Sequence, residues 1–271
     1  MLSQDKLLAG IILSVDKPRQ WTSFQAVNKI KSAIRNLYGL KKIKIGHAGT
    51  LDPLATGLLL VCIGKATKSI PQLQDGDKVY TGTMVLGATT PCFDLEQAVD
   101  KYYPYQHLSL PSVQDAAQQF VGTIMQVPPM FSAVKVDGQR AYEYARKDDP
   151  TVIIQPKPVN VYSFEILSFR EGSHQYTSSS IISQTEGVVH PGIHLYDHPL
   201  GSVPSHLPQI DFRIHCGKGT YIRSLARDLG FSLGSGAFLS DLRRERIGQF
   251  TVKESIGANE VTNYLMNLSN I

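Results

Sequence analysis

The chain has 271 residues, of which 42% are hydrophobic and 18% charged, a composition typical of a globular protein that excludes a disordered chain. Its longest apolar runs, residues 8–15 and 58–63, are much shorter than the ~18 residues that a membrane-spanning helix needs. The net charge of +4 is unevenly spread, since residues 1–72 carry 11 Lys/Arg against 3 Asp/Glu. This basic quarter favours a polyanion such as nucleic acid as the partner, with a solvated basic helix as an equal alternative. No signal-peptide cleavage site follows residues 7–15, so we expect a cytoplasmic protein.

The first elements are predicted from apolar runs and capping residues. Residues 11–15 form a short apolar strand. Thr22 and Gln25 have the spacing of a capping box, and Gly39 ends the helix that they begin. Residues 46–57 include three Gly and one Pro, which predicts a loop, and lead into an apolar strand over residues 58–63.

The rest of the chain alternates strands with two helices. Strands are expected at residues 78–86, 123–127, 131–136, within 151–170 and at 210–216, and helices at 112–121 and from a cap at Thr220. Residues 171–209 are rich in Ser, Gly, Pro and His and indicate a surface insertion. Without a regular βαβ rhythm, the pattern favours an α+β fold with a mixed or antiparallel sheet.

Cofactor and metal motifs are not supported. Gly64 to Thr67 suggests a phosphate loop, but Leu59 occupies the position where that fingerprint needs Gly. The remaining candidates are three widely spaced cysteines, Cys62, Cys92 and Cys216, and three histidines in the insertion, His190, His194 and His198. The cysteines have no C-x-x-C spacing, and Pro and Gly interrupt the histidines. We therefore expect no cofactor, no metal site and reduced cysteines.

Two glycine-rich segments are candidate sites. In residues 46–57, Asp52 precedes Pro53, which orients its backbone; an Asx-turn is the structural alternative to a catalytic carboxylate. In residues 217–223, Arg223 lies in a first helical turn, where a cation needs a compensating anion. Residues 242–246 add three arginines that resemble a phosphate-tracking surface or a solvated charge run. Tyr80 and Tyr221 are candidates for stacking on a base or for the core.

Five segments, taken in order, resemble one family. Residues 46–57 read G-H-A-G-T-L-D-P-L-A-T-G and match the catalytic loop of the TruB-type tRNA pseudouridine synthases. Similar matches are D-K-P…W-T-S at residues 16–23, Q-V-P-P-M-F-S-A-V-K…G…Y-E-Y-A-R at 126–146, K-G-T-Y-I-R at 218–223 and L-R-R…I-G…F at 242–250. The resemblance implies a pseudouridine-synthase-like α+β fold with a large mixed, mostly antiparallel sheet flanked by helices and loops.

The resemblance also implies a reaction and a set of residues. The enzyme would isomerise uridine 55 in the T-loop of tRNA to pseudouridine, without cofactor or metal. Asp52 would be the nucleophile, attacking C1′ or C6 or stabilising a sugar cation. Arg223 would pair with Asp52, and Tyr80 would stack on the flipped base and help to move a proton. The residues implied to contact the substrate are His47, Tyr80, Tyr221 and Leu242.

The sequence departs from the family pattern in one turn, in one motif and in the domains that it contains. Gln20 stands where the first motif usually has Gly, and residues 89–94 match their motif only loosely. We expect a catalytic domain over residues 1–250, with the insertion at 171–209, and a short tail over 251–271 without a complete PUA-type domain. We expect the protein to be a monomer that acts on the T-arm of tRNA. We expect no membrane and no protein partner.

Three other functions remain in competition with the enzyme. A non-catalytic RNA-binding module or tRNA folding chaperone would have no use for an aimed carboxylate. A catalytic subunit guided by a separate RNA would be expected to use the PUA-type domain. A glycoside hydrolase would need paired carboxylates, whereas the loop offers only Asp52.

Overall fold

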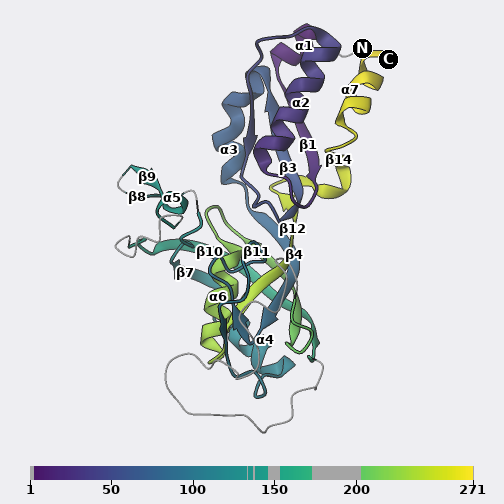
Figure 1. Cartoon of the computed structure of the whole chain (residues 1–271). Helices are drawn as coiled ribbons and strands as arrows, with labels where there is room; N and C mark the ends of the chain where they lie inside the picture. The colour runs from purple at the N-terminus through teal and green to yellow at the C-terminus, as the bar shows by residue number, and fades with distance from the viewer. Residues whose placement is uncertain (1–2, 133, 137, 146–152, 173–202, 271) are drawn as a thin grey trace. The chain divides into compact units, whose positions relative to one another are not determined.

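The computed structural model describes residues 3–132, 134–136, 138–145, 153–172 and 203–270 (Figure 1). The chain contains two compact units, Met1–Tyr80 with Leu242–Ile271, and Thr81–Asp241. Two strands, β4 (Lys78–Leu86) and β12 (Ala237–Ile247), run from one unit into the other. Most of the predicted surface insertion at 171–209 lies outside the described residues.

The first unit is built around a buried strand. Its helices are α1 (Gln4–Ala9), α2 (Ser23–Tyr38), α3 (Ile70–Asp75) and α7 (Val261–Asn270), with short 3-10 turns at Gly64–Ser69 and Val252–Glu254. Its strands are β1 (Ile11–Lys17), β2 (Ile45–Ala48), β3 (Thr56–Ile63), β13 (Phe250–Thr251), β14 (Ile256–Gly257) and the end of β12. Seven of the eight β3 residues are buried, which explains why its sequence is a continuous apolar run rather than an alternating one.

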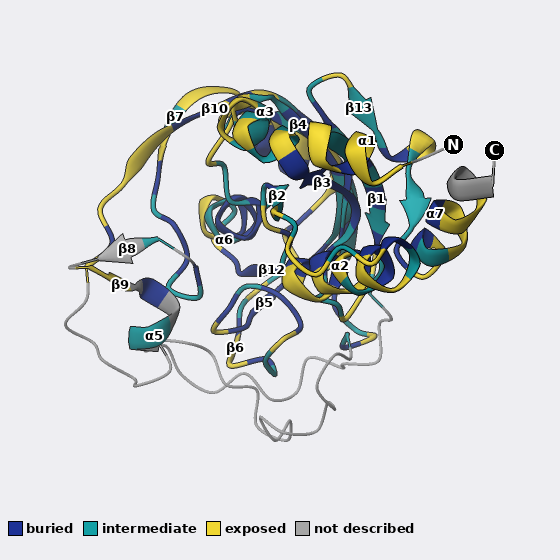
Figure 2. Ribbon diagram, turned by 90° about the horizontal axis from the view of Figure 1, so that it is seen from above, coloured by how far each residue is buried: buried dark blue, intermediate teal, exposed yellow. Residues whose placement is uncertain are grey.

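Helix α2 forms as its capping residues predict. The Thr22 side chain accepts a hydrogen bond from the Gln25 amide, and the Gln25 side-chain oxygen accepts one from the Thr22 amide. Gly39 closes the helix in the left-handed region at φ 67°. Figure 2 shows exposed and buried residues alternating along α2, as expected of a helix with one apolar face.

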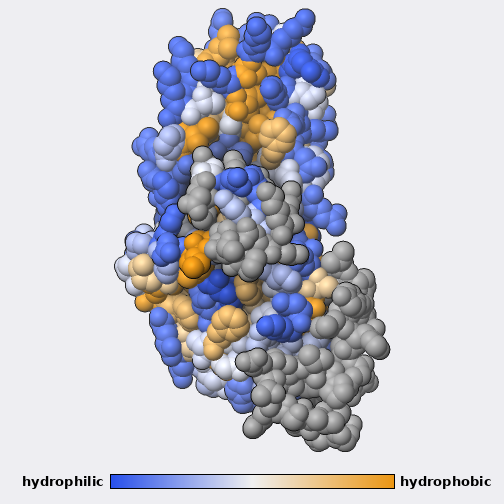
Figure 3. All heavy atoms as spheres, turned by 60° about the vertical axis from the view of Figure 1, so that its left-hand side comes forward, coloured by the Kyte–Doolittle hydropathy of each residue, from blue (hydrophilic) through white to orange (hydrophobic). Residues whose placement is uncertain are grey.

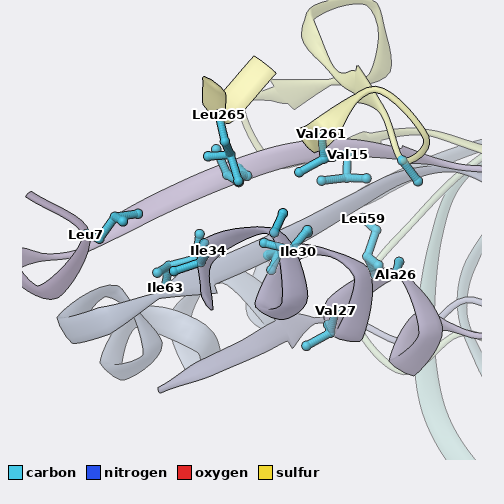
Figure 4. Close-up of a cluster of buried hydrophobic side chains, with 14 of the residues drawn as sticks. Leu7, Val15, Ala26, Val27, Ile30, Ile34, Leu59, Ile63, Val261 and Leu265 are labelled. Atoms are coloured by element: carbon cyan, nitrogen blue, oxygen red, sulfur yellow. The ribbon is translucent and has the colours of Figure 1, made fainter. Parts of the chain in front are cut away.

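The core of the first unit lies between α2, α7 and the strands β1 and β3 (Figure 4). Ile30 and Ile34 of α2 pack in one cluster with Val15 of β1 and with every second residue of β3 from Leu59 to Ile63. The segment after residue 250 is part of this core: β14 pairs in parallel with β1, and Val261 and Leu265 of α7 are buried. Residues 251–271, expected as a tail, thus contribute a strand and a helix to the first unit.

The second unit combines long strands with helices. Its strands are β4, β5 (Ala88–Thr89), β6 (Lys101–Tyr102), β7 (Gly122–Gln126), β8 (Lys135–Val136), β9 (Gln139–Arg140), β10 (Lys157–Arg170), β11 (Gln209–Cys216) and the start of β12. Its helices are α4 (Leu110–Gln118), α5 (Ala141–Ala145) and α6 (Ile222–Ser232). Strand β10 pairs antiparallel with both β7 and β11. The alternation of apolar and polar residues predicted for β11 is confirmed, because Ile210, Phe212 and Ile214 are fully buried.

Hydrogen bonds link the main strands in the order β14-β1-β3-β12-β4-β11-β10-β7. Strand β3 pairs antiparallel with β1 and β2 but parallel with β12, so the sheet is mixed. The expected α+β class with a large, mostly antiparallel sheet is therefore confirmed. The three cysteines are buried and lie outside any disulfide. Among the described residues, no helix has both the length and the apolar character required to cross a bilayer.

Three local predictions need correction. The segment 46–57 is a loop only between β2 and β3, because its two ends extend these strands. The helix expected at 112–121 is α4 at Leu110–Gln118, which begins earlier because Ser109 caps it. Thr220 does not cap α6, since its hydroxyl donates to the Gly217 carbonyl at 3.1 Å and Tyr221 occupies the cap position.

Side chains on the face shown in Figure 3 are mostly hydrophilic, with apolar groups gathered in several small patches. Surface-exposed large apolar residues of the first unit are Leu8, Phe24, Tyr264 and Met266. The cations of α2 and of the turn after it, Lys29, Lys31, Arg35, Lys41, Lys42 and Lys44, are all exposed. The basic N-terminal quarter thus presents its charge to solvent, which fits both interpretations made from the sequence.

Candidate active site

Asp52 lies in the turn between β2 and β3, and the residue is half-buried. Its carbonyl accepts a hydrogen bond from the Ala55 amide at 3.1 Å, which closes a tight backbone turn. Gly49, near the start of the turn, has φ +88°, and Gly57, at its end, has φ +99°. Because L side chains rarely adopt such φ values, glycine is needed at both ends of this segment.

The residue before Asp52 is bound by a buried serine of α2. Ser23 is 3% exposed, and its hydroxyl accepts a hydrogen bond from the Leu51 amide at 2.9 Å and donates one to the Leu51 carbonyl at 3.2 Å. Both backbone polar groups of Leu51 are therefore satisfied without regular secondary structure. The helix N-terminus that Thr22 caps thus positions the turn that carries Asp52.

The residue after Asp52 is held by the first sequence motif. The Pro53 carbonyl accepts hydrogen bonds from the Gln20 amide at 2.8 Å and from the Lys17 ammonium at 3.2 Å. Gln20 adopts φ +67°, a backbone conformation that glycine adopts more easily than residues with a Cβ. The departure at Gln20 therefore affects a turn, as the sequence indicated.

Lys17 is a fully buried cation beside the proposed nucleophile. Its ammonium also donates to the carbonyls of Pro18 and Trp21, at 2.9 and 2.6 Å. Burial lowers the pKa of Lys17 to about 8, the Asp52 carboxylate opposes this shift, and the positive charge of Arg244 adds to it. Asp52 and Lys17 therefore interact as opposite charges, a relationship that the sequence reading did not anticipate.

His47, on β2, is half-buried, and its Nδ1 is buried with no hydrogen-bond partner. Burial is the main cause that lowers the pKa of His47, and the charge of Arg244 lowers it further. The imidazole is therefore neutral at neutral pH. Such a ring can pack beside a base or donate a neutral hydrogen bond, which is compatible with the expected contact to substrate.

Tyr80 and Leu242, two further expected substrate contacts, also belong to the first unit. Tyr80 on β4 is 8% exposed and Leu242 on β12 is 9% exposed. The Leu242 carbonyl accepts a hydrogen bond from the Thr56 hydroxyl at 3.4 Å, at the end of the Asp52 turn. The first unit therefore contains His47, Asp52, Tyr80 and Leu242.

Arg223 lies in the second unit, at the start of α6, and is 5% exposed. Its Nε is 3.6 Å from Oδ2 of Asp94, and its Nη1 and Nη2 donate to the carbonyls of Cys92 and Phe131 at 3.2 and 2.9 Å. The compensating anion that the sequence required for Arg223 therefore includes Asp94. Whether Arg223 also pairs with Asp52, which belongs to the other unit, stays a prediction.

Asp94 was missed as a site residue, although the loose match at residues 89–94 was a signal. Its carboxylate accepts hydrogen bonds from the Glu96 amide at 2.9 Å and from the Cys92 thiol at 3.0 Å. Burial first, and then the charge of Asp94, raises the pKa of Cys92 to about 12. Cys92 thus stays a neutral thiol that donates to the carboxylate.

Tyr221 is half-buried at the start of α6. Its amide donates to the side chain of Gln126 at 2.8 Å, and the Gln126 amide group returns a bond to the Tyr221 carbonyl at 3.1 Å. Gln126 is the first residue of the Q-x-P-P motif, so two of the family-like segments are joined here. The second unit therefore contains Arg223 and Tyr221 and the carboxylate of Asp94.

The interpretation of residues 242–246 as a phosphate-tracking surface is wrong for Arg244, which is 1% exposed. Arg243 and Arg246 have carboxylate partners, Asp16 and Asp77, each at 2.7 Å. The three histidines considered as metal ligands lie outside the described residues. In the part of the chain that the structure describes, no cluster of three His, Cys, Asp or Glu could hold a metal ion.

Comparison with known proteins decides the family. Residues 35–186 match the N-terminal domain of the TruB family pseudouridylate synthases. The chain is also 44% identical, over 94% of its length and 96% of the relative's, to the tRNA pseudouridine synthase B of Flavobacterium johnsoniae. The chain belongs to the TruB family. This TruB-family chain is likewise 42% identical to the protein of the same name from Parabacteroides distasonis, over 95% of its own length and 94% of that protein's.

Solved structures confirm the fold of the TruB family member. A chain in the crystal structure of a Cbf5-Nop10-Gar1 complex superposes with a TM-score of 0.62 and 26% identity, over 98% of this chain and 57% of the other. A chain of the archaeal box H/ACA sRNP Nop10-Cbf5 complex superposes with a TM-score of 0.58 and 23% identity, over 98% and 57%. The pseudouridine-synthase-like fold implied by the sequence is therefore confirmed.

Proposed function

We propose that Asp52 is the nucleophile with which this TruB-family tRNA pseudouridine synthase converts uridine 55 of the T-loop. The observation that supports this role is the local geometry of residues 49–57. The backbone on both sides of Asp52 is hydrogen-bonded to buried side chains, while Asp52 itself is only half-buried. A rigid backbone around a half-buried acidic residue suits a group that must attack at a fixed angle.

The reaction exchanges one bond for another on the same two rings. The N1–C1′ bond breaks, the uracil rotates, a C5–C1′ bond forms, and the proton on C5 leaves while N1 gains one. The Asp52 carboxylate either adds to C1′ or C6 or stabilises the sugar cation, and it is released at the end.

The remaining expected residues receive roles in substrate handling. Tyr80 would stack on the flipped uracil and help to move the proton from C5, and His47 would contact the RNA beside it. Tyr221 and Leu242 would line the uracil pocket. We propose that Arg223, oriented by Asp94, pairs with Asp52 when the RNA is bound. Removing a base from its loop costs a few kcal/mol, which phosphate contacts of exposed cations would offset.

The substrate assignment is tested with an unmodified tRNA transcript and a second transcript in which cytidine replaces uridine 55. The enzyme should form pseudouridine in the first and none in the second, measured by nucleotide mapping of the product. Pseudouridine at another position would refute the assignment to uridine 55. Binding without any product would instead support the RNA-binding or chaperone alternative. We further propose that the enzyme acts as a monomer in the cytoplasm, which size-exclusion chromatography and fractionation test.

A further inference from the structure

Among the described residues, Arg244 is the largest side chain that is fully buried, yet it carries a permanent positive charge. Its guanidinium donates from Nε to the Leu58 carbonyl at 2.8 Å, from Nη1 to the Thr50 carbonyl at 3.3 Å and from Nη2 to the Gly49 carbonyl at 3.0 Å. These three oxygens flank residues 51–57. One side chain therefore contacts the backbone on both sides of Asp52.

The backbone of Arg244 reinforces the same arrangement. Strands β12 and β3 pair in parallel with Arg244 opposite Gly57. A Cβ atom on Gly57 would lie 2.4 Å from the Arg244 carbonyl oxygen, so only glycine allows the two strands to approach this closely. The end of the Asp52 turn, at Gly57, is thereby held by the main chain of Arg244. Its start, at Gly49 and Thr50, is held by the guanidinium.

The charge of Arg244 also reaches the neighbouring site residues. In addition to burial, the positive charge of Arg244 lowers the pKa of both His47 and Lys17. Arg244 therefore interacts electrostatically with two groups beside the Asp52 turn. Removing a guanidinium from water costs free energy, and its hydrogen bonds to carbonyls must offset that cost. A planar guanidinium places its donors on three separate nitrogens in a fixed geometry, whereas the ammonium of a lysine carries all its donors on one nitrogen.

We infer that Arg244 is a positioning residue, which holds the two ends of the Asp52 turn so that the carboxylate is aimed before RNA arrives. This inference rests on the proposed role of Asp52. Arg244 does not touch the substrate in this account, and it acts through the Gly49, Thr50 and Leu58 carbonyls. Its replacement should therefore slow the chemical step at saturating tRNA and leave tRNA affinity nearly unchanged.

The main test compares wild type with Arg244→Lys, which keeps the charge and removes the fork. We expect the single-turnover rate constant to fall about 10- to 100-fold, the scale of a displaced reacting group, while the tRNA dissociation constant changes less than about threefold. Hydrogen exchange of amides in residues 49–57 should accelerate about tenfold or more, without a matching change in α2. An unchanged rate and unchanged exchange would overturn the inference.

Two controls separate positioning from loss of stability. Ile34→Val removes a methylene from the core of the same unit and should lower the melting temperature by a few degrees without accelerating exchange in residues 49–57. Arg246→Lys makes the same change two residues along β12 and should leave that exchange unchanged. If Ile34→Val slows catalysis as much as Arg244→Lys at equal loss of melting temperature, Arg244 is merely structural.

A second variant covers the case in which Arg244→Lys does not fold. A Cβ on Gly49 would lie 3.4 Å from Nη1 of Arg244, and Gly49 has φ +88°. Gly49→Ala should therefore displace the first end of the turn and give the same pattern of slower chemistry with retained tRNA binding. Normal chemistry in that variant would overturn the inference. In every series, an inactive wild type would refute the proposed function itself, whereas an active wild type with normal variants refutes only the role of Arg244.

Discussion

Arg223 and Asp94 form an ion pair inside the second unit, with Nε and Oδ2 3.6 Å apart and side chains that are 6% and 7% exposed. Asp94 is itself held by the Glu96 amide and the Cys92 thiol. A cation in the first turn of α6 is unfavourable in the helix dipole, and this carboxylate compensates for it. The pair therefore fixes the direction of a guanidinium that the family motif carries.

Asp94→Asn tests the importance of this pair. The amide is isosteric but neutral, so the buried Arg223 loses its compensating charge, and the free energy of unfolding should fall by about 1–3 kcal/mol. The rate of pseudouridine formation should fall at least tenfold if Arg223 must be aimed. Asp100→Asn, a change at an exposed carboxylate nearby, is the control and should alter neither quantity appreciably. Equal behaviour of the two variants would mean that Asp94 does not orient Arg223.

Ser23→Ala tests the anchor on the other side of the site. The Leu51 amide and carbonyl would lose their buried partner, which should cost about 1–3 kcal/mol of stability. The single-turnover rate should fall about 10- to 100-fold, because the turn that carries Asp52 loosens. Ser32→Ala, at a half-buried position of the same helix, provides the matched control. Wild-type rates in Ser23→Ala would show that Leu51 needs no anchor.

Lys17 predicts a specific dependence of stability on pH. Its folded pKa of about 8 lies below the ordinary value of 10.5, so the unfolded chain binds more protons between these values. The contribution of Lys17 to stability should therefore rise with pH from about 8 to 10.5, by up to roughly 3 kcal/mol. Denaturant unfolding of wild type and Lys17→Met across this range measures it as the difference between the two. A difference that stays flat or falls with pH would contradict the lowered pKa of the buried Lys17.

The exposed cations of α2 predict a salt-dependent contact with tRNA. The double substitution Lys29→Gln with Lys31→Gln should weaken tRNA binding and reduce the slope of log affinity against log salt by up to about 2, one unit for each lost phosphate contact. Lys253→Gln, which removes an exposed charge outside the basic N-terminal quarter, serves as the control. If the slope is the same in both variants, α2 is a solvated basic helix and not part of the RNA footprint.

The sequence predicted best where a local rule decides the structure. The caps of α2 at Thr22 and Gly39, the limits of β4 and the alternation of β11 all follow from residues adjacent in the chain. Thr220 was wrongly predicted as the cap of α6. Its hydroxyl donates instead to the carbonyl of Gly217 in the preceding turn, which the spacing of residue types does not show.

The site was harder to predict because its supporting contacts join distant residues. The sequence predicted that Arg244 belongs to an exposed run of cations, either a phosphate-tracking surface or a solvated charge run. The parallel pairing of β12 with β3 instead buries it. Asp94 and Ser23 bind partners 129 and 28 residues away, so neither pattern nor spacing could reveal them. The residues implied by the family motifs remain predictions about roles, whereas their local surroundings are now described.

The most direct test of the account is the ratio of pseudouridine formation by Asp52→Asn to that by Asp77→Asn on the same unmodified tRNA. Asp77, paired with Arg246 at 2.7 Å, is an acidic residue of the same unit outside the turn. We predict that Asp77→Asn retains activity within about threefold, while Asp52→Asn loses at least about a thousandfold with tRNA binding intact. Asp52→Asn activity comparable to that of Asp77→Asn would contradict the account.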